Sequence, residues 1–415
     1  MEAVNDKTTY YGQRFEQFIV RMAEVAQRRI EAEDKDAPIT EEARDRALNV
    51  LDYALPRANV WRVGRDLLLA MAPKMETAGH RSGWLAYLER GLAESQHQRD
   101  QVAEAALQYQ CGYLYRLMSS YAQAERLLQA STARYATLGD SEAQARSLNQ
   151  LAYLAWQQHR YDEAEQFAHE ALVLVGKLSL EKAVSLSVLG LIATDQNRPQ
   201  AAENHHRNAL EIRIRHTERR QIAWSLQNIG VALFQQGHYD TAVAHYQRAL
   251  SLLEQLHDLA HQAIVQMNLA LVYHAQGEAR NALQIIAIAE QALSKVCDEF
   301  NLAKLLTTKG LCYLAVSQWK LAEHSFENSM QLFEKLGSYS WYLNALDGLG
   351  ISYLEQELYD KALDVFESVF AQLPQIEGTL AHKYLTTTIS VQLHQARNKT
   401  IQRGYSVYVP PRDKD

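Results

Sequence analysis

The chain has 415 residues, of which 47% are hydrophobic and 22% charged, and its formal net charge is −7. This is the composition of a globular protein, and the negative charge argues against nucleic acid as the main partner because phosphate binding needs a basic surface. Three cysteines, Cys111, Cys297 and Cys312, are too few for a disulfide framework. The first ten residues are polar and no apolar run reaches membrane-spanning length. We therefore expect no signal peptide, no membrane association and a cytoplasmic location.

Residues 1–98 predict an N-terminal helical module that does not follow the pattern of the rest of the chain. Helices are expected at residues 15–30, from 41 to 53, from 58 onward and at 84–96. Residues 1–12 look loose, and 31–38 form a charged loop. Thr40 is a good N-cap for the second helix, and Pro73 is expected to kink or restart the third.

One pattern recurs seven times between residues 99 and 379. Each copy has an alanine early in its second helix, spaced by 38 or 40 residues: Ala124, Ala164, Ala202, Ala242, Ala282, Ala322 and Ala362. Twelve residues before it stands a small residue: Gly112, Ala152, Gly190, Gly230, Ala270, Gly310 and Gly350. Glycine inside a helix costs about 1 kcal/mol relative to alanine. Because glycine returns at the same position of the repeat, we predict that a larger side chain would not fit there. We interpret this as the close approach of two helix backbones.

The small residue, a tyrosine three positions later in several copies and the alanine of the second helix resemble the motif of the tetratricopeptide repeat family. The family period is usually 34 residues. A period near 40 resembles its longer-repeat branch, found in kinesin light chains, cell-polarity adaptors of the LGN type and the sensor arrays of bacterial STAND ATPases. No GxxxxGK[ST] loop is present, so the nucleotide-binding motor of those ATPases is not expected here.

The resemblance implies an all-α fold, a right-handed superhelical α-solenoid of seven helical hairpins. First helices are expected near residues 103–118, 143–158, 182–196, 221–236, 261–276, 301–316 and 341–356. Pro199 opens the second helix of the third copy, where its missing N–H is harmless. After the solenoid, residues 380–397 predict a C-terminal capping helix with a polar outer face. Residues 398–415 contain Pro410 and Pro411 and predict an extended or disordered tail, or one that docks on a protein surface.

In this family fixed positions of the first helices line a concave groove. The groove residues that we expect to bind a partner are Tyr109, Tyr113, Arg116, Gln150, Tyr153, Trp156, Trp224, Asn228, Phe234, Asn268 and His274. Amides can pair with the backbone of an extended peptide, and aromatic rings supply rigid apolar contacts. Asn228 and Asn268 occupy the same position in adjacent copies and would form a ladder of amides. The alternative is that some of these side chains pack between neighbouring first helices.

No arrangement of residues predicts a catalytic, metal or cofactor site, and we expect no enzymatic activity. His257 and His261 are four apart without the glutamate of a zinc protease, and they are interpreted as surface histidines beside a turn. Adjacent His205 and His206 point in different directions on their helix. The four arginines at 213, 215, 219 and 220 are interpreted as a solvated turn, with an anionic contact as the alternative. The cysteines Cys111 and Cys312 are expected to be small core residues.

The sequence favours a non-catalytic scaffold, adaptor or regulatory subunit that binds a protein or peptide segment in its concave groove. The alternative is a sensor whose superhelix changes shape when it binds a peptide or small ligand. A fixed architectural subunit is a third hypothesis. The partner's identity and the oligomeric state do not follow from the sequence.

Overall fold

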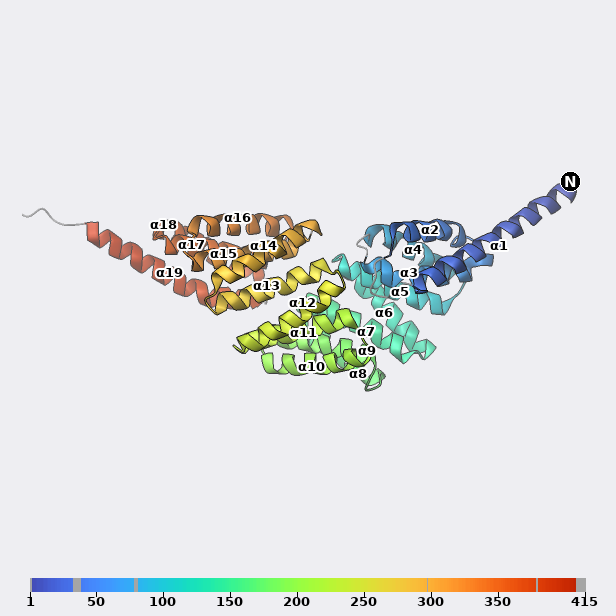
Figure 1. Cartoon of the computed structure of the whole chain (residues 1–415), viewed down its shortest axis with the longest axis horizontal. Coiled ribbons are helices and arrows are strands. Elements are labelled where there is room, and N and C mark those ends of the chain that lie inside the picture. Colours follow the sequence, from blue (N-terminus) through green and yellow to red (C-terminus); the bar gives the residue numbers. More distant parts are fainter. Residues whose placement is uncertain (1, 33–38, 78–80, 297, 378–379, 408–415) are drawn as a thin grey trace, which may run out of the picture. The chain divides into compact units, whose positions relative to one another are not determined.

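The structure, a computed structural model, describes residues 2–32, 39–77, 81–296, 298–377 and 380–407. Within these ranges it contains helices and turns and no strand, which confirms the all-α fold (Figure 1). The chain forms two compact units, of which unit 1 comprises residues 1–192 with 204–218, and unit 2 comprises residues 193–203 with 219–415. Among the described residues, no helix is both long and apolar enough to cross a membrane.

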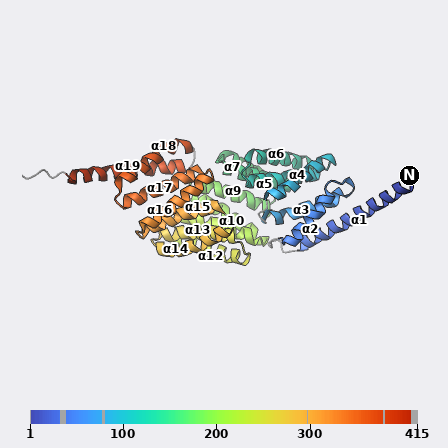
Figure 2. The same cartoon turned by 90° about the horizontal axis from the view of Figure 1, so that it is seen from above.

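The N-terminal part of unit 1 consists of α1 (Glu2–Ala32), α2 (Glu41–Ala54), the 3-10 helix η1 (Ala58–Val60), α3 (Trp61–Thr77) and α4 (Arg81–His97). Thr40 caps α2 as expected, since its Oγ1 accepts a hydrogen bond from the backbone N–H of Ala43 at 3.2 Å. In both ribbon views α1 extends beyond α2 and α3 (Figures 1 and 2).

One expectation for this part was wrong, because α1 begins at Glu2 and residues 2–12 are therefore helical and not loose. Of the two alternatives for Pro73, the restart does not occur, since α3 continues as one helix through Pro73 to Thr77. A kink at Pro73 stays a prediction. Most of the expected charged loop, residues 33–38, lies outside the described residues.

The repeated region is built from helical hairpins. In unit 1 and at its boundary these are α5 (Gln101–Leu117) with α6 (Tyr121–Leu138), α7 (Ser141–Gln157) with α8 (Tyr161–Leu174), and α9 (Leu180–Asp195) with α10 (Pro199–Arg215). Unit 2 holds α11 (Arg219–Gln235) with α12 (Tyr239–Gln255), α13 (Leu259–Ala275) with α14 (Ala279–Lys295), α15 (Glu299–Ala315) with α16 (Trp319–Lys335), and α17 (Tyr339–Glu355) with α18 (Tyr359–Gln372). Each first helix begins two residues and ends one residue before its predicted bound. Consecutive helices pack on one another within each unit, as a solenoid requires.

The hairpins share their turn chemistry. Aspartates cap four first helices and accept a hydrogen bond from the backbone N–H three residues on; these are Asp100, Asp140, Asp258 and Asp298. One residue in the left-handed conformation follows each first helix: Ser119, His159, Asn197, Gly237, Gly277, Ser317 and Glu357. At Gly237 this conformation carries φ +78°, and it lets the N–H of His238 reach back to the carbonyl of Leu233 at 2.9 Å. A short, repeated turn therefore fixes the hairpin angle.

The recurring small residue of the first helix makes room for a side chain. A Cβ added to Gly230 would lie 2.6 Å from the Tyr246 ring, and one added to Gly310 would lie 2.6 Å from the Phe326 ring. The nearest side chain to each recurring glycine stands sixteen residues later, on the second helix. Close approach of two backbones is therefore not what the nearest atoms show at Gly190, Gly230, Gly310 and Gly350, where a ring fills the space. At Gly112 the carbonyl oxygen of Ala124 also lies 3.3 Å from an added Cβ.

The alanines of the second helices are fully buried, as the repeat pattern predicted. We expect Ala242→Leu to destabilise the protein by about 1–3 kcal/mol, since three added carbons have no free volume at the helix crossing. Urea denaturation would measure the loss. The matched control is Ala244→Leu on the exposed side of the same helix, α12. Equal midpoints for the two variants would contradict the assigned packing.

The last helix, α19 (Leu380–Val407), packs on α17 and α18. Its buried side chains Leu385, Ile389 and Leu393 join the core cluster of the seventh hairpin, so α19 covers the apolar face that this hairpin leaves open. The helix continues ten residues past Arg397, and residues 398–407 are therefore helical where an extended or disordered tail was expected. Residues 408–415 lie outside the described residues. The domain boundaries at residues 98, 379 and 397 remain predictions.

Candidate functional site

Unit 1 brings several of the predicted groove residues together around Arg116. The Arg116 guanidinium carbon lies 5.4 Å from the ring centroid of Tyr113 and 5.4 Å from that of Tyr153. Its Nε donates to Gln150 Oε1 at 3.1 Å, and its Nη1 donates to Gln157 Oε1 at 3.0 Å. Cation–π contacts of this kind are worth more when water is excluded. Arg116 is only 8% exposed, so the helices α5 and α7 hold a positive charge inside the unit.

The partners that surround Arg116 in these contacts are neutral. Burial lowers the pKa of Arg116, while the neighbouring tyrosines Tyr113 and Tyr153 act in the opposite direction. An arginine remains protonated in proteins even so. Tyr109 stacks on Tyr113 with ring centroids 6.3 Å apart, and Trp156 meets Tyr153 edge to face at 6.4 Å. Six of the predicted residues, Gln150 among them, thus form one aromatic and amide cluster with a buried cation at its centre.

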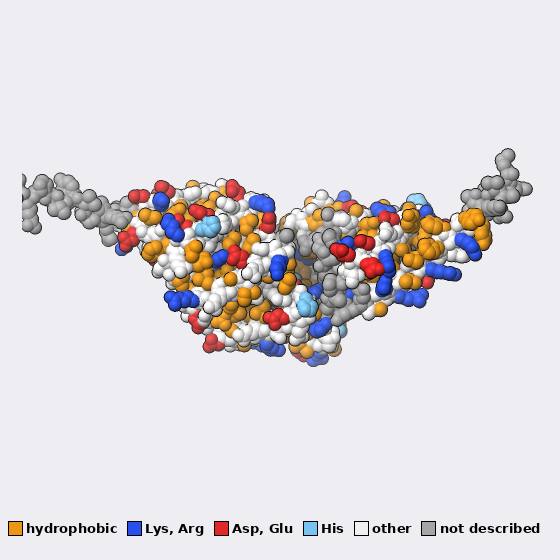
Figure 3. Space-filling view, turned by 45° about the horizontal axis from the view of Figure 1, so that its top comes forward, with side chains coloured by type: hydrophobic (Ala, Val, Ile, Leu, Met, Phe, Trp, Pro, Cys, Tyr) orange, Lys and Arg blue, Asp and Glu red, His pale blue; other side chains and the backbone are white. Residues whose placement is uncertain are grey.

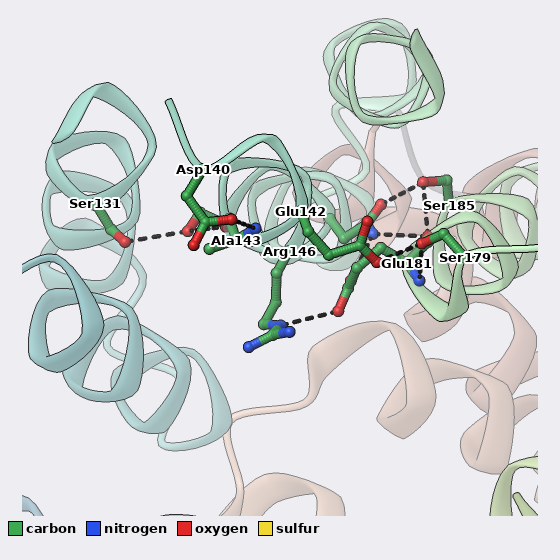
Figure 4. A network of polar contacts seen from close by, with 10 residues as sticks. Ser131, Asp140, Glu142, Ala143, Arg146, Ser179, Glu181 and Ser185 are labelled. Atoms are coloured by element: carbon green, nitrogen blue, oxygen red, sulfur yellow. Dashed lines mark hydrogen bonds and ion pairs between the residues drawn. The ribbon is translucent and has the colours of Figure 1, made fainter. Parts of the chain in front are cut away.

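A second polar network joins α7 to α9 (Figure 4). Asn149 Nδ2 donates to the carbonyl oxygen and to Oε2 of Glu181, both at 3.0 Å, and the Ser185 hydroxyl donates to Asn149 Oδ1 at 2.6 Å. Arg146 Nε lies 2.9 Å from Glu181 Oε1. Burial alone would lower the pKa of Arg146, but its hydrogen bond and charge interaction with Glu181 outweigh that effect and raise it. This network locks the second hairpin to the third, so Asn149 is structural.

In unit 2 the predicted Trp224 stacks on His261, with ring centroids 4.9 Å apart. His261 Nδ1 lies 2.9 Å from both carboxylate oxygens of Asp258, and Arg220 Nε forms an ion pair with the same carboxylate at 3.1 Å. Burial acts to raise the pKa of Asp258, but these partners outweigh it and lower that pKa. The Trp224 indole N–H is buried and has no hydrogen-bond partner among the described residues.

Asn228 on α11 and Asn268 on α13 are half-buried, and neither side chain is hydrogen-bonded to another described residue. They occupy the same position of two successive repeats, two residues before the small residues Gly230 and Ala270. Phe234 contacts Tyr239 at 5.7 Å between ring centroids. His274 is half-buried, burial lowers its pKa, and its Nδ1 has no hydrogen-bond partner among the described residues.

A tetratricopeptide repeat model matches residues 144–215, 181–255, 221–295 and 301–375, which together cover more than half of the chain. The chain belongs to the tetratricopeptide repeat family. A search of curated proteins found no match.

Solved structures show the same fold at low sequence identity. A Rap protein complexed with Competence and Sporulation Factor is 14% identical with a TM-score of 0.57, over 93% of this chain and 99% of that one. NprR in complex with its cognate peptide NprX is 12% identical with a TM-score of 0.55, over 73% and 88%. A STAND protein with a tetratricopeptide repeat sensor from Pyrococcus horikoshii is 12% identical with a TM-score of 0.50, over 88% and 53%. At these identities the likeness concerns the fold alone.

Within the tetratricopeptide repeats, the structure corrects the interpretation of the arginines as a solvated turn. Arg213 is buried, at 4% exposure, and burial lowers its pKa. Arg215 pairs with Glu211 at 2.7 Å, and Arg220 pairs with Asp258. The histidine interpretation was correct for exposed His257, while His261, whose side chain is 35% exposed beside the same turn, also contacts the Trp224 ring at a tilt of 36°. Among the described residues no group of three His, Cys, Asp or Glu side chains could hold a metal ion.

Sequence reasoning missed Gln157, Glu181 and His261 as partners of the candidate residues. Each lies about one repeat away in sequence from the residue that it contacts, such as Arg116 and Gln157 or Trp224 and His261. The signal was available in the period itself, because a side chain on one first helix meets the next first helix 32 to 41 residues later. Cys111 and Cys312 are buried as expected, and burial raises the pKa of each thiol to about 12. Cys297 lies outside the described residues.

Proposed function

We propose that the tetratricopeptide repeats bind an extended segment of a partner protein, in a non-catalytic scaffold, adaptor or regulatory role. One observation carries this proposal: Asn228 and Asn268 present side-chain amides at the same phase of successive first helices and have no hydrogen-bond partner among the described residues. Each amide can donate to and accept from one peptide unit. Two such amides in register would hold an extended chain with little dependence on its side chains.

The aromatic residues around these amides would determine which peptide sequences bind. The Trp224 N–H and His274 Nδ1 are buried and have no partner among the described residues, so either atom could bond to a bound chain only if its side chain turned toward that chain. In unit 1 the buried Arg116 has amide and aromatic contacts, which leaves its charge uncompensated by them. A buried cation favours an acidic group on the ligand, because a charge-assisted hydrogen bond offsets the cost of desolvation.

A second candidate function is a sensor that responds to a short peptide. It is supported by the fold shared with a Rap protein complexed with Competence and Sporulation Factor and with NprR in complex with its peptide NprX. The two candidates differ in partner size and in shape change. Small-angle scattering with and without ligand discriminates them, since a sensor is expected to compact on binding and a scaffold is not.

For the binding role, we expect the double variant Asn228→Ala, Asn268→Ala to lose affinity by about 1–3 kcal/mol for each amide removed, because peptide groups of the ligand would be left unpaired. Affinity purification with mass spectrometry first identifies the partner, and titration calorimetry of the purified partner measures the loss. The control is Asn204→Ala, Asn208→Ala, which removes two exposed amides from α10. Equal affinity of the two double variants would place the binding site elsewhere.

A further inference from the structure

The helix α1 carries two separate apolar faces. One face is buried on its own unit through Ile19, Ala23 and Ile30. The other face consists of the exposed Tyr11, Phe15, Phe18 and Val25 with the half-buried Met22, a set that we call the α1 stripe. Its large members are 67%, 41%, 57% and 59% exposed at Tyr11, Phe15, Phe18 and Val25 respectively. Figure 3 shows hydrophobic side chains gathered on α1 next to the grey N-terminal atoms.

The spacing of the α1 stripe is that of a coiled-coil seam. Its residues follow one another at intervals of four, three, four and three positions, which is the alternation of the two apolar positions of a heptad. Such a seam is narrow, whereas a helix that lies in a membrane interface needs a broad apolar face. The exposed Arg29 occupies the next seam position and ends the stripe.

Phe15 has neighbours outside α1. Its ring meets that of Tyr53, from α2, edge to face at 5.7 Å, and Tyr53 is itself 52% exposed. The guanidinium of Arg57 lies 5.4 Å from the Phe15 ring centroid, and Arg57 Nη1 donates to the Tyr53 carbonyl at 2.6 Å. These contacts hold Phe15 in place while leaving the outer side of the seam open.

The charges beside the α1 stripe determine which partner fits. Arg14, Arg21 and Arg28 are exposed and recur every seven residues, so they form a ladder along one edge of the seam. Arg14 lies over the Tyr10 ring at 5.2 Å, and Arg28 has a long contact with Glu24 at 3.4 Å. The other edge of the seam holds Gly12, Ile19 and Ala26, of which Ile19 is buried on its own unit and Ala26 is half-buried. The edge with the arginines is therefore basic, and the edge with Gly12, Ile19 and Ala26 is uncharged.

These charges disfavour a second copy of this chain as the occupant. In an antiparallel pair the two arginine ladders would face each other, and like charges across an interface are repulsive. In a parallel pair each ladder would face Gly12, Ile19 and Ala26, which carry no acidic group.

We propose that the α1 stripe docks an amphipathic helix of a partner protein whose apolar seam is flanked by acidic residues. The arginine ladder would pair with those acids and fix the register, and Phe15, Phe18 and Val25 would fill the holes of the partner seam. This surface is separate from the first helices of the repeats, so the chain would have two docking sites and could join two proteins.

The test uses the full chain and a fluorescein-labelled helical peptide of about 21 residues, three heptads long, with leucines in the seam and glutamates at both flanking positions. A matched peptide carries lysines at the flanks. Fluorescence anisotropy is expected to show the glutamate peptide binding at least about tenfold more tightly than the lysine peptide, because like charges at an interface repel. The preference should weaken as salt is added, since exposed pairs are screened.

Two sets of variants locate the binding. Reversal of the ladder by Arg14→Glu, Arg21→Glu and Arg28→Glu is expected to invert the preference between the two peptides, a result that loss of folding cannot produce. The truncations Phe18→Ala and Val25→Ala should abolish binding, whereas the control Val173→Ala, at an exposed valine of α8, should not. Equal binding of both peptides, or none, overturns the proposal.

Two further outcomes would also overturn it. Sedimentation velocity would reveal a wild-type dimer that Phe18→Ala converts to a monomer, in which case a second copy covers the α1 stripe. Flotation with phosphatidylcholine and phosphatidylserine vesicles, lost in Phe18→Ala, would instead assign the stripe to a membrane surface. If neither dimerisation nor vesicle binding depends on Phe18, and the arginine reversal inverts the peptide preference, the results support docking of a partner helix with acidic flanks.

Discussion

His206→Phe is expected to stabilise unit 1 at neutral pH by about 1–3 kcal/mol, because it removes buried polar atoms that have no partner. The imidazole of His206 is fully buried in α10, and neither ring nitrogen has a hydrogen-bond partner among the described residues. It lies against Gly190, whose added Cβ would be 2.5 Å from the ring. Tyr246, Phe326 and Phe366 occupy the same repeat position on the second helices, so a phenyl ring fits opposite a glycine there.

The same substitution should remove a pH dependence. Burial, with the nearby charge of Arg213 and the neighbouring His205, lowers the pKa of His206 to about 3. The ordinary histidine pKa is about 6.5, so between these values the unfolded chain binds a proton that the folded chain does not. This contribution is intact above pH 6.5 and is lost as the pH falls. Between pH 7.5 and pH 5 the loss amounts to about 2 kcal/mol in the wild-type protein.

Hydrogen exchange of the α9 and α10 amides at the two pH values measures this local stability, and it does not require the two units to unfold together. His169→Phe is the control, since it replaces an exposed histidine of α8 in the same unit. Wild-type protein and this control should both lose stability between pH 7.5 and pH 5, and His206→Phe should lose about 2 kcal/mol less. An identical loss in all three proteins would contradict a buried, uncharged His206.

The period of the repeat determined most of what could be predicted. The bounds of the first helices followed from the small residue and the alanine, because the small residue leaves room for a side chain of the second helix and the alanine is buried against the first helix. The same pattern could not reveal that Gly190 faces a histidine while Gly310 faces a phenylalanine, since the partner stands sixteen residues away on another helix. The repeat period therefore shows that the small-residue position is packed, but it does not identify the side chain that packs there.

The candidate site was less predictable for a related reason. Asn149, Gln150, Asn228 and Asn268 all look alike in sequence, as amides near the middle of first helices. The Asn149 amide is hydrogen-bonded to Glu181 and Ser185, and the Gln150 amide is hydrogen-bonded to Arg116. The side chains of Asn228 and Asn268 are not hydrogen-bonded to other described residues. Which amide is used internally depends on the residue that the neighbouring first helix presents. Local propensity holds no information about this pairing.

Asp347→Asn is expected to stabilise the last repeat of unit 2 by up to about 4 kcal/mol at pH 8 and by only about 1.5 kcal/mol at pH 5. The carboxyl group of Asp347, on α17, is 4% exposed, and burial raises its pKa to about 7, while a hydrogen bond with Gln392 of α19 acts in the opposite direction. Asp347 Oδ1 and Gln392 Oε1 are buried and have no hydrogen-bond partner among the described residues. An asparagine at 347 could donate to Gln392 Oε1 without carrying a charge.

The sign of the pH effect follows from the direction of the shift. The ordinary aspartate pKa is about 3.9, so between pH 4 and pH 7 the folded chain holds a proton that the unfolded chain has released. Stability from Asp347 is therefore present at low pH and is lost as the pH rises through 7. This is opposite to the effect of His206 on unit 1, so acid weakens one unit while it favours the packing of α19 in the other.

Hydrogen exchange of the α17 and α19 amides at pH 5 and pH 8 measures the change, because those two helices meet at the Asp347 carboxyl. Asp364→Asn, at an exposed aspartate of α18, is the matched control and should leave both values unchanged. Protection of α19 in the wild-type protein should fall between pH 5 and pH 8 and should stay constant in Asp347→Asn. A wild-type α19 that is equally protected at both pH values would mean that Asp347 is ionised, and satisfied, in the folded chain.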